Sequence, residues 1–362
     1  MKTFLSSLCI FFSSVAVCES GLQQFVTGSR FENICSQTVL SKSGKSTNSH
    51  RINRPAFAIS KKYFYAALEE YHEGSLYSSV YRAVKAGRGG LKKIFMSRQK
   101  IRDVLYLNRE VWALQNHRIL IMSDDGSNPR EIPLGNTAEK RYQHGYDMAV
   151  VGPYVVVSYG QAGLILINKS EMTVEKAIDL GLRRRRGHLS LATSLAALNE
   201  TTVIVGVDNA TMAKRGRRPF NGLIEVDILA MTSRRYPYNV EISGMLSKNS
   251  KMQVKDRFLW INNWGNIQFL DLDAMRAGNE AKIGWIPTTY NQNGKKWSAQ
   301  PSGEFLLVGG DMFVCAKRSM LQTTKRSTPK GMVYRIPEIA SKATSVETAI
   351  YWRFDIQDSA HP

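Results

Sequence analysis

Residues 143–181 read QHGYDMAVVGPYVVVSYGQAGLILINKSEMTVEKAIDLG and contain four short apolar runs. The runs are YDMAVV, YVVVSY, GLILIN and TVEKAIDL, and each has the length of an ordinary β-strand. Val, Ile, Leu and Tyr fill them, and these residues favour strands. Turn-forming residues separate the runs at Gly152-Pro153, Gln161-Ala162-Gly163 and Ser170-Glu171. The stretch therefore predicts four consecutive antiparallel strands.

Weaker copies of this pattern occur from Pro55 onward. Their third strands begin at residues 79, 118, 163, 222, 266 and 331, so that successive gaps are 39, 45, 59, 44 and 65 residues. Four-stranded units that recur every 40–50 residues or so are typical of β-propellers. We therefore expect residues 55–356 to form an all-β propeller with six four-stranded blades. Seven blades are the second possibility, and a pair of β-sandwiches is the alternative fold.

The third strand of the opening stretch belongs to a recognisable motif. GQAGLILINKSEMTVEKAIDLG resembles the repeat of bacterial and archaeal propellers whose third strand reads GLVIVDIS, the LVIVD-type repeat. GLIEVDI at 222–228 and NIQFLDLD at 266–273 are similar, whereas the first, second and sixth repeats match it weakly. The motif consists of packing residues, so the resemblance implies a propeller fold and no particular activity.

The two ends of the chain differ from this repeated region. Residues 1–20, MKTFLSSLCIFFSSVAVCES, combine Lys2, a short apolar run and small residues, which indicates a signal peptide. Residues 21–54 are a polar extension, and 357–362 form a short tail. No later apolar run reaches about 18 residues, so we expect no membrane span. The expected location is secreted, or periplasmic in a bacterium.

Two cysteines remain once the leader is removed, Cys35 and Cys315. A lone pair in an exported chain is a candidate disulfide, and this one would join the N-terminal segment to the last repeat. Two buried free thiols are the alternative. Three Asn-x-Ser/Thr sequons, at Asn168, Asn199 and Asn209, could carry glycans after export through a eukaryotic route.

The chain is strongly basic, with 49 Lys and Arg against 30 Asp and Glu and a formal net charge of +19. Such a charge favours an anionic partner, although a basic surface can also serve solubility alone. Many of the basic residues lie where second strands would connect to third strands, or one blade to the next, and in a propeller both kinds of connection share one face. The clusters are Arg98, Lys100 and Arg102; Lys140, Arg141 and His144; Arg183, Arg184, Arg185 and Arg186; Lys214, Arg215, Arg217 and Arg218; Lys295 and Lys296; and Lys325, Arg326 and Lys330.

These clusters are expected to form a basic rim on one face of the ring. Guanidinium forks suit phosphate, sulfate or carboxylate groups. Trp264 and Trp297 are expected beside them, where aromatic rings could stack on sugars or bases, although such rings often only fill space between blades. Glu69 and its acidic neighbours belong to the same face. The alternative is that RRRR and KRGRR are processing sites or solvated turns.

Signals for catalysis are weak. Oxygen-bearing side chains that could converge in a central channel are Asp147, Asp208, Asn262 and Asp311. Such ligands suit Ca²⁺, but Asp and Asn are also ordinary turn formers. The sequence contains no Gly-x-Ser-x-Gly, no His-Glu-x-x-His and no phosphate-binding Gly loop.

The sequence thus favours a secreted binding module, with no cofactor or metal, that recognises an acidic glycan, a nucleic acid or an acidic protein. A metal-dependent hydrolase resembling a lactonase is the second interpretation. A protein-interaction scaffold that uses the opposite face is the third.

Overall fold

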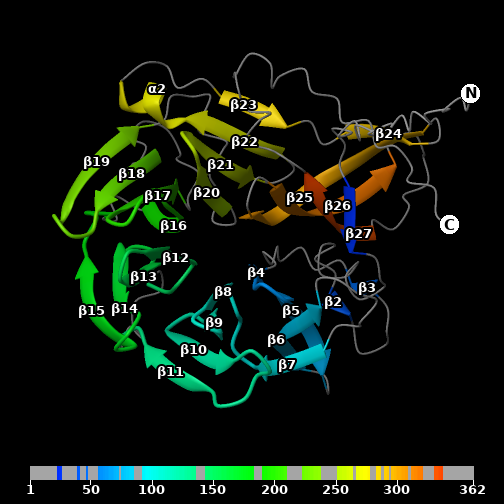
Figure 1. Ribbon diagram of the computed structural model, residues 1–362, viewed down its shortest axis with the longest axis horizontal. Helices are drawn as coiled ribbons and strands as arrows, with labels where there is room; N and C mark the ends of the chain where they lie inside the picture. Colours follow the sequence, from blue (N-terminus) through cyan, green and yellow to red (C-terminus); the bar gives the residue numbers. More distant parts are fainter. Residues whose placement is uncertain are drawn as a thin grey trace, which may run out of the picture.

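The structure is a ring of antiparallel sheets around a central channel (Figure 1). The computed structural model describes residues 23–26, 39–40, 46–47, 56–72, 75–84, 92–135, 143–182, 190–209, 222–237, 251–263, 266–277, 283–286, 289–292, 295–308, 311–320 and 330–336. From residue 283 onward only the side chains of Phe305 and Leu307 are described. Within these ranges no helix is long and apolar enough to span a membrane.

Five sheets are four-stranded blades, each ordered from an innermost to an outermost strand. Blade 1 contains β4 (Ala56–Ile59), β5 (Tyr63–His72), β6 (Ser75–Val84) and β7 (Lys92–Ser97). Blade 2 contains β8 (Asp103–Leu107), β9 (Glu110–Leu114), β10 (Arg118–Ser123) and β11 (Arg130–Pro133). Blade 3 contains β12 (Asp147–Val151), β13 (Tyr154–Ser158), β14 (Leu164–Asn168) and β15 (Thr173–Ile178). The opening stretch of sequence is therefore blade 3, as predicted.

Blade 4 contains β16 (Ser190–Ala197), β17 (Thr202–Asn209), β18 (Gly222–Asp227) and β19 (Thr232–Pro237). Blade 5 contains β20 (Lys251–Lys255), β21 (Phe258–Asn263), β22 (Asn266–Asp271) and β23 (Ile283–Ile286). A short helix, α2 (Leu272–Arg276), follows β22, and the Asp271 side chain caps it by accepting hydrogen bonds from two backbone N–H groups. The sequence reasoning placed the fourth strand of blade 4 near residues 236–242, several residues too late.

A sixth sheet closes the ring, with the strand order β1-β27-β26-β25-β24. It contains β24 (Thr289–Gln292), β25 (Lys295–Val308), β26 (Asp311–Met320), β27 (Lys330–Ile336) and β1 (Gln23–Val26). Innermost strands contact each other in the circular order β4, β8, β12, β16, β20, β25 and back to β4. Near the N-terminus, β2 (Val39–Leu40) and β3 (Ser46–Thr47) form a small separate pair.

The expectation of six or seven four-stranded blades is wrong in its count, because the structure has five. The last repeat was expected to end with a strand in SVETAIYW, residues 345–352, which lie outside the described residues. In the structure β27 pairs on one side with β26 and on the other with β1 from the N-terminal extension. An N-terminal strand thus occupies the place expected for the C-terminal one, a long-range pairing that no local pattern reveals.

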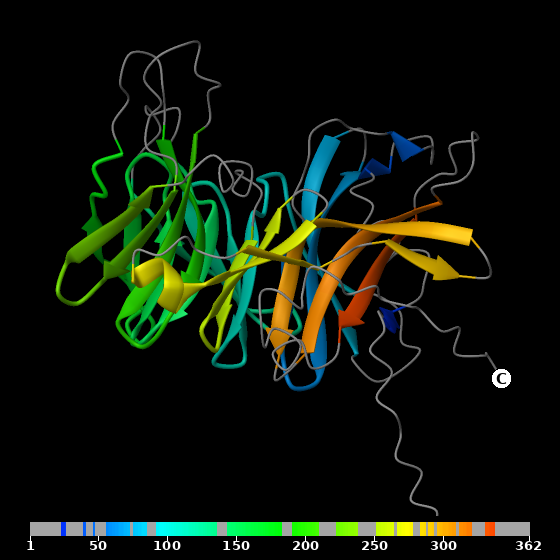
Figure 2. The ribbon, with the colours of Figure 1, turned by 90° about the horizontal axis from the view of Figure 1, so that it is seen from above.

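Apolar clusters between neighbouring blades form the core. Along β13, Val155 and Val157 pack toward blade 2, whereas Val156 packs toward blade 4. This alternation follows from the period of two in a strand. Since both faces of each blade are covered, the blades read as nearly continuous apolar runs rather than as alternating ones. Figure 2 shows the ring from the side, as a disc in which these blades stand next to one another.

Gly163 illustrates how one turn in blade 3 depends on its residue. Its φ of +86° lies in the left-handed region, and a Cβ there would be 2.2 Å from the carbonyl oxygen of Ile178. Gly135 has a φ of +104°, but a Cβ there would meet nothing within 4 Å. Both positions need a glycine for backbone conformation, and only Gly163 also needs it for space.

We therefore expect Gly163→Ala to destabilise the protein more than Gly135→Ala. The matched control, Gly135→Ala, should cost about 1–2 kcal/mol from backbone strain alone. Gly163→Ala adds a clash with a backbone atom that cannot rotate away, so the difference should exceed about 1 kcal/mol. Urea denaturation of both variants measures this. Equal midpoints would show that the turn relaxes without cost.

Candidate binding face and the channel beneath it

The predicted rim lies almost wholly outside the described residues. This holds for Lys140, Arg141, Arg183, Arg184, Arg185, Arg186, Lys214, Arg215, Arg217, Arg218, Lys325, Arg326 and Trp264. Lys295, Lys296 and Trp297 lie on β25, but their side chains are outside the described part. Cys35 lies outside the described residues. Cys315 lies on β26, but its side chain is outside the described part. Rim and disulfide both stay predictions.

The strands that flank two of these segments are described. Ser190, which follows the segment 183–189, pairs with Asn209, which precedes the segment 210–221. Val207 in turn pairs with Gly222, the first residue after that segment. The flanking residues of both segments therefore lie at the same end of blade 4. Strand direction requires this in a four-stranded antiparallel blade.

One predicted basic cluster, between blades 1 and 2, is described in full. Arg98 Nε donates to the Tyr77 hydroxyl at 3.1 Å, and Lys100 Nζ lies 3.3 Å from a carboxylate oxygen of Glu69. Arg102 is partly buried, and its Nε donates to Asn116 Oδ1 at 2.6 Å. The three basic residues thus have three different kinds of partner, and among the described residues only the Lys100 side chain of these three is in contact with a carboxylate.

Around Arg102 the end of blade 2 carries rings as well as charge. The Arg102 guanidinium lies 5.3 Å from the ring centre of Tyr146, and the His144 ring lies 4.4 Å from that same centre. His117 Nδ1 is 3.0 Å from the Tyr159 hydroxyl. Burial, together with the nearby positive charge of Arg102 and an electrostatic interaction with His117, lowers the pKa of His144 to about 4. His144 is therefore neutral at physiological pH, and the field at this place is positive.

Below this face, a buried charge cluster crosses the channel. Lys251 Nζ lies 2.7 Å from Asp147 Oδ1 and 3.2 Å from Asp103 Oδ2. The three residues are the first ones of β20, β12 and β8, so they come from three different blades. Both aspartates are fully buried and Lys251 is nearly so. We call this group the channel cluster.

The two carboxylates of the channel cluster also connect neighbouring blades. Asp103 Oδ2 accepts a hydrogen bond of 2.8 Å from the backbone N–H of Met148 on β12. Asp147 Oδ2 accepts one of the same length from Leu195 on β16. Each aspartate therefore binds the innermost strand of the next blade. Charge-assisted hydrogen bonds of this kind are stronger than neutral ones.

The candidate channel residues named from sequence are only partly brought together. Asp147 belongs to the channel cluster, and buried Asn262 pairs in register with Lys251. Asp208 is partly buried on β17, and the Asp311 side chain lies outside the described part. Sequence reasoning missed Asp103 and Lys251. A charged residue at the start of an otherwise apolar innermost strand was the available signal.

This arrangement bears on the metal-enzyme interpretation. The carboxylates of Asp103 and Asp147 are bound by the Lys251 ammonium and by backbone N–H groups. Among the described residues, no group of three or more His, Cys, Asp or Glu side chains is placed to hold a metal ion. The channel oxygens seen here thus serve contacts between blades.

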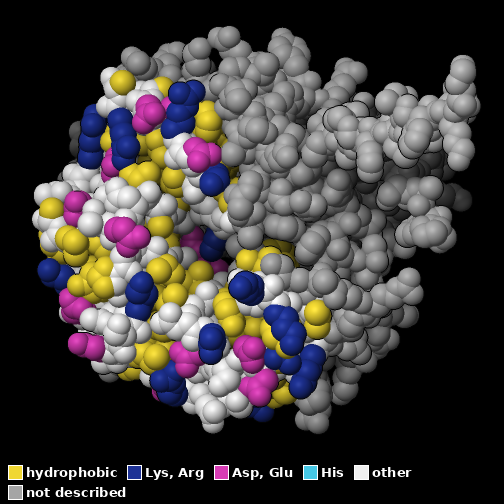
Figure 3. Space-filling model, viewed as in Figure 1, with side chains coloured by type: hydrophobic (Ala, Val, Ile, Leu, Met, Phe, Trp, Pro, Cys, Tyr) yellow, Lys and Arg dark blue, Asp and Glu magenta, His cyan; other side chains and the backbone are white. Residues whose placement is uncertain are grey.

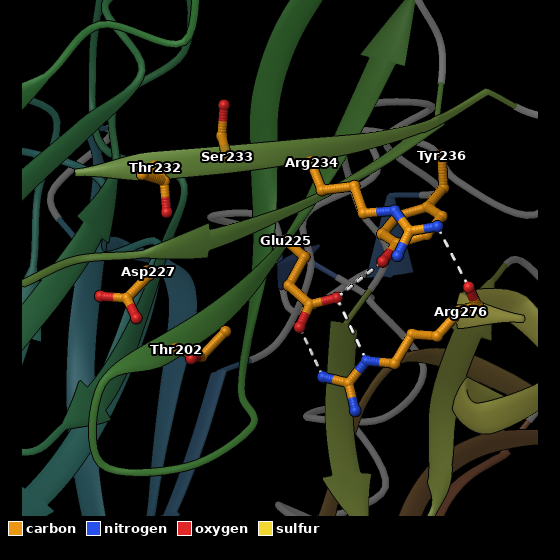
Figure 4. Close-up of a pocket in the computed structure, with 8 residues that line it drawn as sticks. All are labelled: Thr202, Glu225, Asp227, Thr232, Ser233, Arg234, Tyr236 and Arg276. Carbon is orange, nitrogen blue, oxygen red and sulfur yellow. Dashed lines mark hydrogen bonds and ion pairs between the residues drawn. The ribbon is translucent and has the colours of Figure 1, made fainter. Parts of the chain in front are cut away.

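A polar pocket of about 310 Å³ lies at the outer edge of blades 4 and 5 (Figure 4). Its lining residues are Thr202, Glu225, Asp227, Thr232, Ser233, Arg234, Tyr236 and Arg276. Glu225 accepts hydrogen bonds from the Tyr236 hydroxyl at 2.9 Å and from the Arg276 guanidinium. Hydrogen bonding to Arg276 and Tyr236, despite burial, keeps the pKa of Glu225 below its usual value.

Two consecutive arginines explain why this pocket exists. Arg234 Nη2 donates to the carbonyl oxygen of Arg276 at 3.1 Å, whereas Arg235 Nη2 donates to that of Leu180 at 2.6 Å. Because neighbours on a strand point to opposite faces, β19 binds blade 5 with one arginine and blade 3 with the other. The pocket is therefore a polar seam between blades, whose principal charges are already paired.

Two sequons lie in described turns. Asn168 Oδ1 accepts hydrogen bonds from the backbone N–H groups of Ser170 and Glu171, and partly buried Asn168 closes the turn before β15. Exposed Asn199 does the same for Thr201 and Thr202. The side chain of Asn209 is outside the described part. Glycosylation at all three stays a prediction.

No protein-family model matches the chain, and no curated protein is similar to it in sequence. Solved structures of similar shape include the WD40 domain of Neurospora crassa Pan2 (TM-score 0.40, 11% identity, 79% of this chain and 89% of that one). Another is Sqt1 of Saccharomyces cerevisiae (TM-score 0.44, 11% identity, 76% and 69%). A third is the computationally designed protein Ika8 (TM-score 0.42, 11% identity, 80% and 98%). Similarities this distant carry no functional argument, and the propeller fold rests on the strand pairing itself.

Lys251→Met should destabilise the protein by about 3–5 kcal/mol, because it removes an ammonium group that contacts two buried carboxylates. The matched control is Lys255→Met on the same strand. It removes an ion pair in which Lys255 Nζ lies 3.8 Å from Asp256 Oδ1, and the two side chains are 39% and 58% exposed. That change should stay within about 0.5 kcal/mol. Adding Asp103→Asn to Lys251→Met should recover part of the loss. Chemical denaturation measures all four proteins, and a harmless Lys251→Met would contradict this assignment.

Acidification should destabilise the protein through His144. Its folded pKa of about 4 lies below the ordinary value of 6.5, so between these values the unfolded state binds more protons. Stability therefore rises with pH across this window and is lost as pH falls through it. His144→Gln should lose less stability than the parent between about pH 7 and pH 5. As a control, the urea midpoints of the two proteins should change in parallel between about pH 7 and pH 8. If the two proteins also lost stability equally below pH 7, His144 would not be a buried neutral ring.

Proposed function

We propose that this chain is an exported binding protein, which uses its propeller as a scaffold and engages an acidic partner through the predicted basic rim. The net charge of +19 favours such a partner. The observation that carries the proposal is strand direction in blade 4, where Ser190 pairs with Asn209. Because these two residues pair, the segment that contains Arg183–Arg186 ends, and the segment that contains Lys214–Arg218 begins, at the same end of blade 4.

Clustering of this kind has an electrostatic cost that a partner can offset. Eight like charges in two adjacent segments repel one another, and a Debye length of about 8 Å at physiological salt screens them only partly. An acidic partner replaces this repulsion by attraction and releases its own counterions when it is a nucleic acid. The likeness of β14, β18 and β22 to the LVIVD-type repeat belongs to the same proposal, since it is compatible with a scaffold and names no chemistry.

The test removes four positive charges from the predicted rim and compares the effect on binding with that of removing four positive charges elsewhere. Changing Arg184, Arg185, Arg217 and Arg218 to Ser should weaken binding to heparin or single-stranded DNA by at least tenfold at about 0.15 M salt, and should reduce its dependence on salt. The melting temperature should be equal or slightly higher. Heparin chromatography and fluorescence anisotropy measure the two effects.

The matched control changes Arg109, Lys176, Lys255 and Arg257 to Ser. Arg109 and Arg257 lie in turns between first and second strands, at the end of the blades opposite the rim. Net charge falls by the same four units, so any effect of total charge alone appears in both variants. If the two variants lose affinity equally, or if neither loses any, the rim does not form the binding site.

A further inference from the structure

Arg102 differs from Arg118 and Arg276 in what its guanidinium contacts. Arg118 donates to Gln115 and to the Glu131 carboxylate, and Arg276 donates to both oxygens of Glu225. Among the described residues, the Arg102 side chain makes one hydrogen bond, from Nε to Asn116 Oδ1. Within the described part of the chain, its two terminal nitrogens have no hydrogen-bond acceptor, although they carry most of the donors of the group.

The surroundings of Arg102 favour binding of an anion by those donors. The side chain is partly buried, and desolvation lowers its pKa. The charge of Glu69 acts on Arg102, but the Glu69 carboxylate lies 3.3 Å from the Lys100 ammonium and so already has a cation. The guanidinium is restrained on two sides, because its Nε donates to Asn116 and its central carbon lies 5.3 Å from the centre of the Tyr146 ring. Little further conformational entropy is lost when an anion binds it.

From this geometry we infer that Arg102 is the anchoring residue of the binding face and that it takes a side-chain carboxylate from an acidic protein segment. The inference rests on the proposed function and adds the class of partner. One carboxylate matches two parallel N–H donors of a guanidinium in a bidentate pair. Asn116 and Tyr146 are positioning residues, because they orient Arg102.

The described part of this face fits an acidic protein better than a uniform polyanion. Glu69 stands beside Lys100, so positive and negative groups are interspersed next to Arg102. A sulfated glycan or a nucleic acid, charged at every unit, would place an anion against Glu69. A protein segment can instead place a carboxylate at Arg102 and a neutral or basic side chain at Glu69. Complementary patterns of charge are the usual basis of such specificity.

The probe is a fluorescein-labelled peptide of about a dozen residues with alternating Glu and Ser, compared with heparin and with single-stranded DNA. Arg102→Gln should weaken binding of the peptide by about tenfold or more, and should change binding of heparin by less than about threefold. Arg102→Lys keeps the charge but loses the fork, so it should recover only a small part of the affinity. Circular dichroism and thermal melting establish whether each variant is folded. If Arg102→Gln does not fold, Arg102→Lys is used in its place.

The matched control is Arg118→Gln. Arg118 begins β10 at the same end of blade 2, and its guanidinium is already bound by Gln115 and Glu131. It should change peptide binding by less than about threefold. If Arg102→Lys binds the peptide as well as the parent does, or if Arg118→Gln weakens binding as much as Arg102→Gln, general charge and not the fork of Arg102 governs binding, and the inference is wrong.

Failure of the inference and failure of the proposed function give different results. If the parent binds the peptide and the Arg102 variants bind it equally well, Arg102 is not the anchor, while the proposed function stands. If the parent binds heparin or DNA at physiological salt but not the peptide, the partner class is wrong and the basic rim still binds anions. If the parent binds none of the three probes, both proposals fail.

Discussion

At the centre of the ring, one ammonium group contacts carboxylates from two other blades. Lys251 on β20 reaches Asp103 on β8 and Asp147 on β12, and the same carboxylates accept N–H groups from β12 and β16. Four innermost strands are thus joined by one continuous set of polar contacts. Gln253 extends it, because its amide exchanges hydrogen bonds with the backbone of Phe305 and Leu307 on β25.

A buried network of this kind is not the source of the fold's stability. Apolar burial between blades supplies the driving force, and replacing a buried ion pair by apolar residues often stabilises a protein. Hydrophobic contact is non-directional, however, and tolerates small sliding of one blade against the next. Hydrogen bonds of defined length at the first residues of the innermost strands do not. We therefore regard the channel cluster as the feature that sets the register of neighbouring blades, a hypothesis that the Lys251 and Asp103 variants address.

Local sequence predicted most of the blades. The runs DVLYL, EVWALQ and RILIMS coincide with β8, β9 and β10, because strands buried on both faces appear as short apolar segments between turn residues. In the tight turn between β8 and β9, Asn108 and Arg109 both have positive φ, which Asn adopts readily. Long-range contacts were not accessible. The pairing of β1 with β27 joins segments more than 300 residues apart, and no periodicity encodes it.

The candidate site shows the same limit. Sequence reasoning grouped Arg98, Lys100 and Arg102 as equivalent charges of one rim, yet the structure gives them a phenol, a carboxylate and an amide as partners. Residues that are distant in the chain decide which basic side chains are paired within the fold. Lys100, for example, is paired with Glu69. The channel cluster was missed for this reason too, since Lys251 and Asp103 are 148 residues apart.

Net charge therefore has to be divided between what the fold uses and what remains for a partner. Lys251, Arg235 and Arg276 contribute to the total of +19, but each has its acceptors inside the protein. Figure 3 shows one face of the ring, on which described basic and acidic side chains are interspersed rather than segregated. The number of basic residues alone would predict that the whole surface binds anions. A cation that is oriented, partly desolvated and without a carboxylate hydrogen-bonded to it among the described residues is a more specific feature, and Arg102 at the end of blade 2 meets that description.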